Sequence, residues 1–467
     1  AVYPGDKNNL PYDVVVERLH IEEPEPPAPV TEPEKTFEEV LDEHPVSIQV
    51  NGQWQTFPNA KAAEEASYEE YKANLRRNAK NFRITDEHLG EGGPKAKFQA
   101  NVNAIRLLKE LEAAGQQASP EQQEVLSRYV GWGGLSDAFD PEKPAWALEY
   151  AQLKELLTPE EYAAARGSTL NAHYTSPTVI RAIYETVGRM GFETGNILEP
   201  SCGVGNFFGM LPEEMRNSRL YGVELDSISG RIAKQLYPKA DITVAGFETT
   251  DRRDFYDLAI GNVPFGQYQV RDKAYDKLNF SIHNYFFAKA LDQVRPGGVV
   301  AFVTSRYTMD AKDSTVRRYL AQRAELLGVI RLPNDAFKKN AGAEVVSDII
   351  FLQKRDRPLD IVPEWTQTGQ TEDGFAINRY FIDHPEMVLG RQEPVSTAHG
   401  MDYTVNPIEG LELSDQLHDA VKYIHGTYQE AELPELGEGE AIDTSIPADP
   451  NVKNYSYAIV DGQVYYR

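Results

Sequence analysis

The chain has 467 residues, of which 41% are hydrophobic, and its formal net charge is −25. That length is enough for two or three domains with a large buried core. No apolar run reaches the roughly 18 to 20 residues of a membrane helix, no signal peptide opens the sequence, and the single cysteine, Cys202, excludes intrachain disulfides and a zinc cluster. We expect a cytoplasmic protein without a membrane partner or a metal and, because Ala1 is not Met, a processed product or a piece of a longer protein.

The negative charge is unevenly distributed. Residues 171–357 hold about 25 Lys and Arg against about 22 Asp and Glu, so this segment carries about +3 and its flanks about −28. An acidic chain disfavours a nucleic-acid partner, but a nearly neutral central segment leaves one open.

Two segments precede that centre. Residues 1–45 are rich in proline and glutamate, which is typical of an extended tail or linker. Residues 46–170 begin with a hairpin pattern around Asn51-Gly52 and continue with apolar residues at helical spacing, interrupted by the glycine-rich stretch 129–135. This pattern predicts a mainly helical N-terminal domain over 46–170.

Residues 171–357 alternate between predicted strands and predicted helices. The strands are predicted at 196–199, 219–223, 241–245, 256–261, 298–304, 325–331 and 347–353, and the helices near 178–190, 227–237, 283–294 and 312–322. The alternation predicts an α/β domain with a seven-stranded, mostly parallel sheet, whose ligands sit beyond the carboxyl ends of the strands. Residues 358–467 are a C-terminal extension with an amphipathic helix near 413–425, a candidate DNA-recognition or linker region.

A glycine turn follows the first of these strands. It runs Glu199-Pro200-Ser201-Cys202-Gly203-Val204-Gly205-Asn206-Phe207. Its two glycines allow a ligand to approach the backbone closely, although many such turns are only tight bends. The acid inside the turn would repel a pyrophosphate, so it favours a ligand with an ammonium group, such as S-adenosylmethionine. The predicted cofactor-binding residues in the turn are Glu199, Pro200, Ser201, Gly203, Gly205 and Phe207.

Residues on the next two strands extend this predicted cofactor site. Glu224 ends the second strand, about 20 residues further on, where it can accept both ribose hydroxyls. After the third strand, Phe247 would pack either on the adenine ring or in the core, and Glu248 could accept the exocyclic amine. Cys202 is expected to be a buried thiol with no base to activate it.

The fourth strand ends in the tip Asn262-Val263-Pro264-Phe265. An aromatic amine is a poor nucleophile because its lone pair is delocalised into the ring. If the Asn262 side-chain oxygen and the Val263 carbonyl accept its N–H groups, the nitrogen becomes more tetrahedral and its lone pair points at the methyl donor. Phe265 would stack on the flipped base, a contact worth about 1–3 kcal/mol.

Together these motifs resemble the amino-group DNA methyltransferases that modify adenine N6. The resemblance covers about 171–357 and includes Tyr174-Thr175-Ser176, which is similar to an element that closes over the methionine part of the cofactor. It implies a Rossmann-like S-adenosylmethionine-dependent methyltransferase fold, S-adenosylmethionine as the cofactor, contacts to it from Tyr174, Thr175 and Ser176, and DNA as the substrate.

Two positions depart from the family's pattern. Val263 replaces the first proline of the tip, although Pro264 still restricts Val263 to extended conformations. Gly246 stands where the family usually places an aspartate against the cofactor's adenine, a role that Glu248 could take.

The stretch 129–135 and the tip resemble more specifically the methylase part of very large methylase–helicase proteins of phages and conjugative elements. The chain contains no Gly-x-x-x-x-Gly-Lys-Ser/Thr phosphate loop. A helicase region is therefore expected elsewhere in the same larger polypeptide, in a mobile-element or restriction-modification context.

The loop after the tip, 266–282, interleaves basic and aromatic residues. This composition suits contacts to a DNA backbone and stacking on bases, although a solvated surface loop can share it. The predicted DNA-binding residues are Tyr268, Arg271, Lys273 and Lys277.

Three alternatives stay open. An amine or amide methyltransferase acting on RNA or protein uses the same tip. A non-catalytic module that binds S-adenosylmethionine or DNA within an anti-restriction or helicase machine would fit the acidic balance and Gly246. Methylation of cytosine N4 usually employs a tip that begins with serine, so Asn262 disfavours it.

Overall fold

The computed structural model describes residues 45–50, 53–67, 80–86, 88–169, 175–338, 344–397, 400–430, 457–460 and 463–466. The described residues up to Gln429 form one compact unit, and a hairpin of β14 (Tyr457–Val460) and β15 (Gln463–Tyr466) belongs to a second unit. Apart from Pro45, the predicted tail 1–45 lies outside the described residues.

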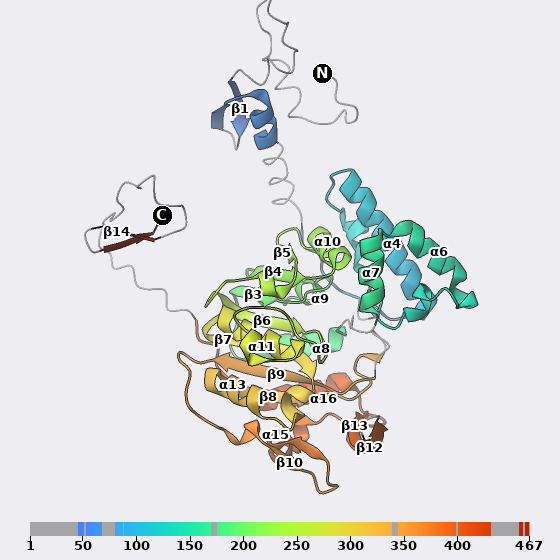
Figure 1. Cartoon of the computed structure of the whole chain (residues 1–467), viewed down its shortest axis with the longest axis vertical. Coiled ribbons are helices and arrows are strands. Elements are labelled where there is room, and N and C mark those ends of the chain that lie inside the picture. The colour runs from blue at the N-terminus through green and yellow to red at the C-terminus, as the bar shows by residue number, and fades with distance from the viewer. Residues whose placement is uncertain are drawn as a thin grey trace, which may run out of the picture. The chain divides into compact units, whose positions relative to one another are not determined.

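The centre of the larger unit is a seven-stranded sheet (Figure 1). In chain order its strands are β3 (Asn196–Glu199), β4 (Arg219–Glu224), β5 (Asp241–Val244), β6 (Tyr256–Asn262), β7 (Val294–Ser305), β8 (Ala324–Arg331) and β9 (Ser347–Lys354). They lie in the order β5-β4-β3-β6-β7-β9-β8, and only the pairs that involve β9 are antiparallel. The predicted fold class, a Rossmann-like α/β fold with a mostly parallel seven-stranded sheet, is confirmed.

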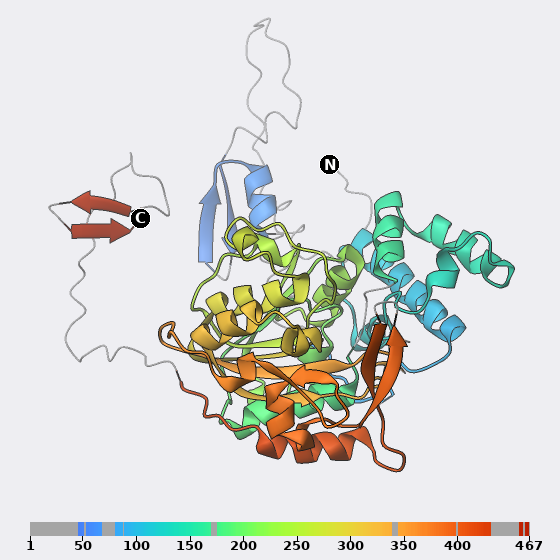
Figure 2. The same ribbon diagram turned by 60° about the horizontal axis from the view of Figure 1, so that its bottom comes forward.

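Helices cover both faces of this sheet. α11 (Ile282–Gln293) and α13 (Thr315–Arg323) pack together on one face, and α8 (Pro177–Arg189) and α16 (Leu413–Ala420) pack together on the other, as Figure 2 shows. Nearly every residue of α11 is buried, since this helix lies against β7 on one side and α13 on the other.

A helical region precedes the sheet; a separate domain over 46–170 stays a prediction. It consists of α4 (Pro94–Ala113), α5 (Pro120–Ser127), α6 (Ala147–Leu156) and α7 (Pro159–Ser168). Its core is built around Trp132, which is 1% exposed and lies edge-on to Phe98, Tyr129 and Phe139. Below, the helical region means residues 94–169.

The chain after 357 packs against a cluster of buried charges at the edge of the sheet, to which it contributes Tyr403. Arg331, at the end of β8, makes two 2.7 Å bonds to Asp348 on β9 and one of 2.8 Å to Asp310. The Tyr403 hydroxyl donates to the same Asp310 carboxylate at 2.6 Å. Each charge of this cluster therefore has a partner, as a buried ion pair requires. A separate role for 358–467 stays a prediction.

Short elements complete the structure. The remaining strands are β1 (Val46–Val50), β2 (Gln53–Phe57), β10 (Thr368–Gln370), β11 (Ala376–Asn378), β12 (Arg391–Thr397) and β13 (Gly400–Asn406), and the remaining helices are α9 (Asn206–Gly209), α10 (Ser227–Leu236), α12 (Tyr307–Asp310) and α15 (Arg379–Asp383). The 3-10 helices are η1 (Ser136–Phe139), η2 (Pro144–Trp146), η3 (Glu213–Met215), η4 (Phe247–Thr249), η5 (Asp276–Leu278), η6 (Glu364–Thr366), η7 (Pro385–Met387) and η8 (Val421–Tyr423). Within the described residues, no helix combines the length and apolarity needed to cross a membrane.

Candidate active site

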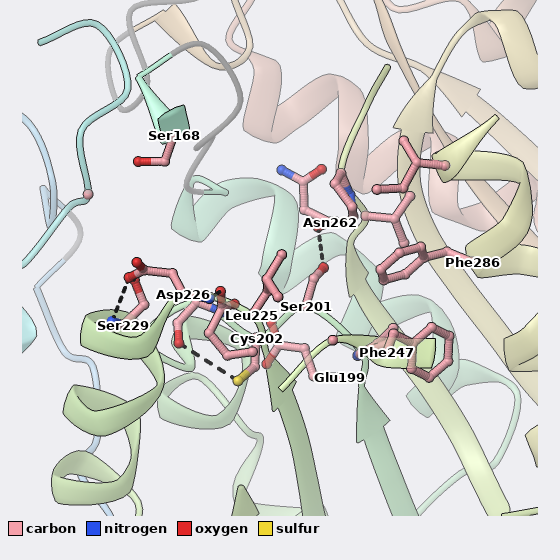
Figure 3. A pocket seen from close by; sticks show the side chains of 18 of the residues that line it. Ser168, Glu199, Ser201, Cys202, Leu225, Asp226, Ser229, Phe247, Asn262 and Phe286 are labelled. Atoms are coloured by element: carbon pink, nitrogen blue, oxygen red, sulfur yellow. Dashed lines mark hydrogen bonds between the residues drawn. The ribbon is translucent and has the colours of Figure 1, made fainter. Parts of the chain in front are cut away.

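A cavity of about 590 Å³ opens at the carboxyl ends of β3, β4, β5 and β6 (Figure 3). Its lining includes the residues that end or directly follow these strands, namely Glu199, Glu224, Phe247 and Asn262. Because the four strands are parallel neighbours, these residues meet at one edge of the sheet, where open α/β sheets bind their ligands.

Most of the residues selected from the sequence line this cavity. They are Thr175, Glu199, Pro200, Ser201, Gly203, Phe207, Glu224, Phe247, Glu248, Asn262, Val263, Pro264, Phe265, Tyr268 and Arg271. Ser176, Gly205, Lys273 and Lys277 are not part of its lining, and Tyr174 lies outside the described residues. Within the described residues, no group of three or more His, Cys, Asp or Glu side chains could hold a metal ion.

Two of the selected residues outside the lining have a definite place in the fold. Ser176 is the N-cap of α8, where its backbone carbonyl accepts the N–H groups of Val179 and Ile180 at 3.1 and 3.2 Å and its side chain makes no capping hydrogen bond. Gly205 has φ +85°, and a Cβ there would lie 2.5 Å from the Tyr237 ring. Glycine at 205 is thus required by packing, and its contact with a cofactor stays a prediction.

Glu199 is a buried carboxylate on the cavity wall. It is 2% exposed, and its Oε2 has no hydrogen-bond partner within the described residues. Burial raises the pKa of this carboxyl well above its usual value, and the nearby Glu224 adds to the shift. The neighbouring Tyr184 hydroxyl donates instead to the Phe207 carbonyl at 2.8 Å. A ligand cation could therefore supply the partner that this carboxylate lacks.

Glu224 is a second carboxylate on the cavity wall; it is half-buried, and its oxygens are partnered. It accepts the backbone N–H groups of Gly203 and Asp226, each at 2.7 Å. Burial raises its pKa to about 7, although these hydrogen bonds oppose the shift. The bonds tie the glycine turn to the end of β4 and place an acceptor beside the turn.

The tip is tied to the strands on both of its sides. The Asn262 carbonyl accepts the Ser201 hydroxyl at 2.9 Å, and the Val263 N–H donates to the Val303 carbonyl of β7 at 3.1 Å. Figure 3 shows the first bond dashed, with Asn262 above Ser201. The Val263 side chain is 1% exposed, so the residue that replaces the family's proline also belongs to the core.

The end of β5 presents an aromatic ring and a carboxylate. Phe247 is buried and packs against the tilted ring of Phe286 with 4.9 Å between the ring centroids, so it is a core residue that also lines the cavity. A Cβ at Gly246 would lie 2.1 Å from Glu248 Oε1. The Glu248 carboxylate therefore occupies the space that a side chain at 246 would take.

The loop after the tip has an anchored side and an exposed side. Asp272 accepts the buried Lys289 ammonium at 2.8 Å, and Lys289 also donates to the Glu248 carbonyl at 3.1 Å. These bonds hold the loop next to η4. Its exposed side chains include those selected from the sequence as DNA-binding, Tyr268, Arg271, Lys273 and Lys277.

Part of the lining was missed by sequence reasoning. The helical region contributes Tyr129, Gly131, Ala164, Gly167 and Ser168, and the start of α10 contributes Leu225, Asp226 and Ser229. The second group could have been found from the sequence, because Leu225 directly follows the predicted ribose-binding residue Glu224. In the structure the apolar Leu225 side chain is 76% exposed. For the first group no motif pointed to this cavity.

The family model described as N-6 DNA Methylase matches residues 155–368. This match confirms the resemblance to amino-group DNA methyltransferases that the motifs indicate. It also agrees with S-adenosylmethionine as the cofactor.

Two curated proteins are similar to parts of the chain. Defense against restriction protein B of Escherichia phage P1 is 27% identical over 272 residues, which are 57% of this chain and 10% of that protein. The type II methyltransferase M.CvrRI of Paramecium bursaria Chlorella virus XZ-6E is 38% identical over 92 residues, 20% of this chain and 24% of that protein. The chain thus spans a quarter or less of either relative.

Solved structures give weaker likenesses. A protein from Listeria monocytogenes, assigned to the class I S-adenosylmethionine-dependent methyltransferases, is 18% identical with a TM-score of 0.37, covering 58% of this chain and 90% of that chain. A protein from Vibrio vulnificus YJ016, assigned as the modification subunit of a type I restriction enzyme, is 14% identical with a TM-score of 0.34, covering 72% of this chain and 94% of that chain.

Proposed function

We propose that the chain transfers a methyl group from S-adenosylmethionine to the N6 amine of adenine in DNA, acting on a base flipped out of the duplex. The observation that carries this proposal is that one cavity is lined both by the tip Asn262–Phe265 and by the buried Glu199 carboxylate, whose Oε2 has no hydrogen-bond partner in the described part of the chain. A cofactor with an ammonium group and a planar amine would meet there at the ends of the neighbouring strands β3 and β6.

The residues present fit S-adenosylmethionine, which would supply a methyl group on a sulfonium. Glu199 would pair with its ammonium group, and Glu224 would accept the ribose hydroxyls. Phe247 and the exposed Leu225 would enclose the adenine ring. The Glu248 carboxylate, lying over Gly246, would accept the exocyclic amine in place of the family's aspartate.

The tip would position the acceptor amine. The Asn262 side-chain oxygen and the Val263 carbonyl would accept its two N–H groups, so that the nitrogen lone pair points toward the methyl group. Fixed positions matter for this role, and the tip has them because its backbone is bonded to Ser201 and Val303. Phe265 would stack on the flipped base.

DNA would lie against the loop after the tip. Its exposed basic residues, Arg271, Lys273 and Lys277, would contact phosphates, and the half-exposed Tyr268 would stack on a base. The near neutrality of residues 171–357 permits such contacts in a chain whose net charge is −25.

We further propose that the chain works within a larger mobile-element or defence-related protein, with a helicase region of the same polypeptide as a candidate partner. Support comes from the length of the curated relatives, of which this chain covers 10% and 24%, and from the name of the phage P1 protein.

The proposal is tested by transfer of labelled methyl from S-adenosylmethionine to DNA of mixed sequence, followed by digestion to nucleosides and chromatography. We expect label in N6-methyldeoxyadenosine with the wild type and none with Asn262→Ala. Label in N4-methyldeoxycytidine, or in RNA or protein only, would contradict the proposal. Cofactor binding without transfer to any DNA would favour a non-catalytic module.

A further inference from the structure

We propose that the helical region is part of the cofactor site. In this proposal the face of α7 that carries Ala164, Gly167 and Ser168, together with the turn at Tyr129–Gly131, forms the wall that encloses the adenosine end of S-adenosylmethionine. This inference rests on the proposed function, because it names a further part of the same binding site.

The small residues of α7 face the cavity. Ala164, Gly167 and Ser168 are spaced by three and four positions, so they share one helix face, and all three line the cavity. A Cβ at Gly167 would meet no atom within 4 Å. Figure 3 shows Ser168 across open space from Asp226 and Ser229, which also line the cavity. The two walls are therefore separated by room for a ligand.

The glycine-rich turn is a rigid part of this wall. The buried Asn101 side chain donates to the Gly131 carbonyl at 2.5 Å and accepts the Val130 N–H at 2.9 Å. Gly131 has φ +68°, a conformation that favours glycine. Because Trp132 directly after it is fully buried, the turn is fixed by the core of the helical region.

An ion-pair cluster holds this wall over the cavity. Arg231 of α10 forks to Glu112 of α4 with bonds of 2.7 and 2.5 Å and donates to Glu161 of α7 at 2.8 Å. Although burial opposes ionisation, hydrogen bonds from Lys109 and Arg231 hold the pKa of Glu161 below its usual value. At the other end of α10, the Gln123 side chain donates to the Leu236 carbonyl at 3.2 Å. α10, whose first turn lines the cavity, is thus tied to the helical region at both ends.

The adenosine end is the part of the cofactor that this wall fits. Glu199 and Asn262 take the ammonium group and the acceptor amine in the proposed function, so the part of the cavity lined by Phe247, Leu225 and α7 remains for ribose and adenine. A ligand that touches both walls binds more tightly when the helical region is docked, and by linkage its binding stabilises the docking.

A matched pair of substitutions on α7 tests the wall. Ala164 and Ala163 are neighbouring exposed residues of the same helix, but only Ala164 lines the cavity. We expect Ala164→Phe to weaken S-adenosylmethionine binding at least tenfold by calorimetry, and Ala163→Phe to leave it within twofold. The pair carries the same change in helix propensity, so the unliganded proteins should melt at the same temperature.

The outcomes separate this inference from the proposed function. If the wild type binds no S-adenosylmethionine, the proposed function fails and this inference fails with it. If the wild type and both variants bind S-adenosylmethionine equally tightly, the helical region is not part of the cofactor site, while the proposed function stands. Loss of DNA methylation by Ala164→Phe with unchanged cofactor binding would also overturn the inference, because the wall would then face the base.

Hydrogen exchange tests the linkage. In the wild type, S-adenosylmethionine should slow amide exchange in the helical region, and Arg231→Ala should reduce that protection and weaken binding. Arg216→Ala removes an exposed pair with Glu213 away from the cavity lining and should change neither. Ligand protection confined to the ends of the sheet strands would contradict the linkage.

Discussion

At the cofactor end of the cavity the polar groups are two carboxylates with raised pKa values, the buried Glu199 and the half-buried Glu224. At the tip end they are an amide and backbone groups bonded to neighbouring strands. Glu199 has an oxygen without a hydrogen-bond partner in the described structure, while the Asn262 carbonyl and the Val263 N–H both have partners. Cofactor affinity should therefore depend on the ionisation of the two carboxylates. Methyl transfer should depend on the fixed position of the tip.

The largest effect expected at the tip is that of Asn262→Ala. Removing the side-chain oxygen leaves the acceptor amine without its positioning group, so methyl transfer should fall by about 10³-fold or more. The cofactor end is untouched, and the S-adenosylmethionine dissociation constant should stay within about threefold. Single-turnover transfer and calorimetry measure the two quantities. A parallel loss of both would show that the two ends are not independent.

Glu199→Gln should have the largest effect at the cofactor end. A hydrogen bond to a charged group contributes about 1.5–3 kcal/mol, so binding of S-adenosylmethionine should weaken about 10- to 100-fold. The unliganded protein should respond in the opposite direction. Since the folded state raises the pKa of Glu199, folding loses stability as pH rises above the usual carboxyl range, and glutamine removes that loss.

The melting temperature of unliganded Glu199→Gln should accordingly exceed that of the wild type at pH 8, and the difference should shrink toward pH 5. Thermal denaturation across this range checks the sign. A variant that is less stable than the wild type at pH 8 would mean that Glu199 is paired in the unliganded protein.

A smaller effect is expected from Glu224. With its pKa at about 7, Glu224 is ionised in about a tenth of the molecules at pH 6 and about nine tenths at pH 8. If the ionised form binds the ribose hydroxyls, cofactor affinity should rise up to about tenfold over that interval. Calorimetry of the Glu199→Gln variant measures this affinity without a contribution from the ionisation of Glu199. When Glu224→Gln is added, cofactor affinity should no longer change with pH. A pH dependence that persists would come from another group.

The part of the molecule that could be predicted from sequence is the part whose signals are local. Strands buried on both faces, such as β6, β7 and β9, read as continuous apolar runs, and all seven strands of the sheet were found. Glu199, Glu224 and Asn262 end such strands, and a parallel sheet brings those ends together. The start of β7 was missed, because Arg295-Pro296-Gly297-Gly298 is typical of a turn; in the structure Val294 already pairs with Tyr256 ahead of a register shift.

The helical wall could not be predicted, because it depends on docking between distant segments. Arg231 and Glu112 are 119 positions apart, and neither residue belongs to a motif. Gly205 shows a second limit of sequence patterns. Its glycine is part of a motif, but the packing of Tyr237 against it is invisible in the sequence.

Val263→Pro should have the smallest effect. The family's proline would fix φ, and Pro264 already restricts Val263 to extended conformations. Proline lacks the N–H that Val263 donates to Val303, so the variant should lose about 0.5–1.5 kcal/mol of unfolding free energy. Methyl transfer should stay within about threefold, because the carbonyl at 263 remains and the other bond that fixes the tip, from the Ser201 hydroxyl to the Asn262 carbonyl, is kept. Val263→Ala keeps the N–H and controls for the lost side chain. If proline abolished transfer and alanine did not, the bond to β7 would be the group that positions the tip.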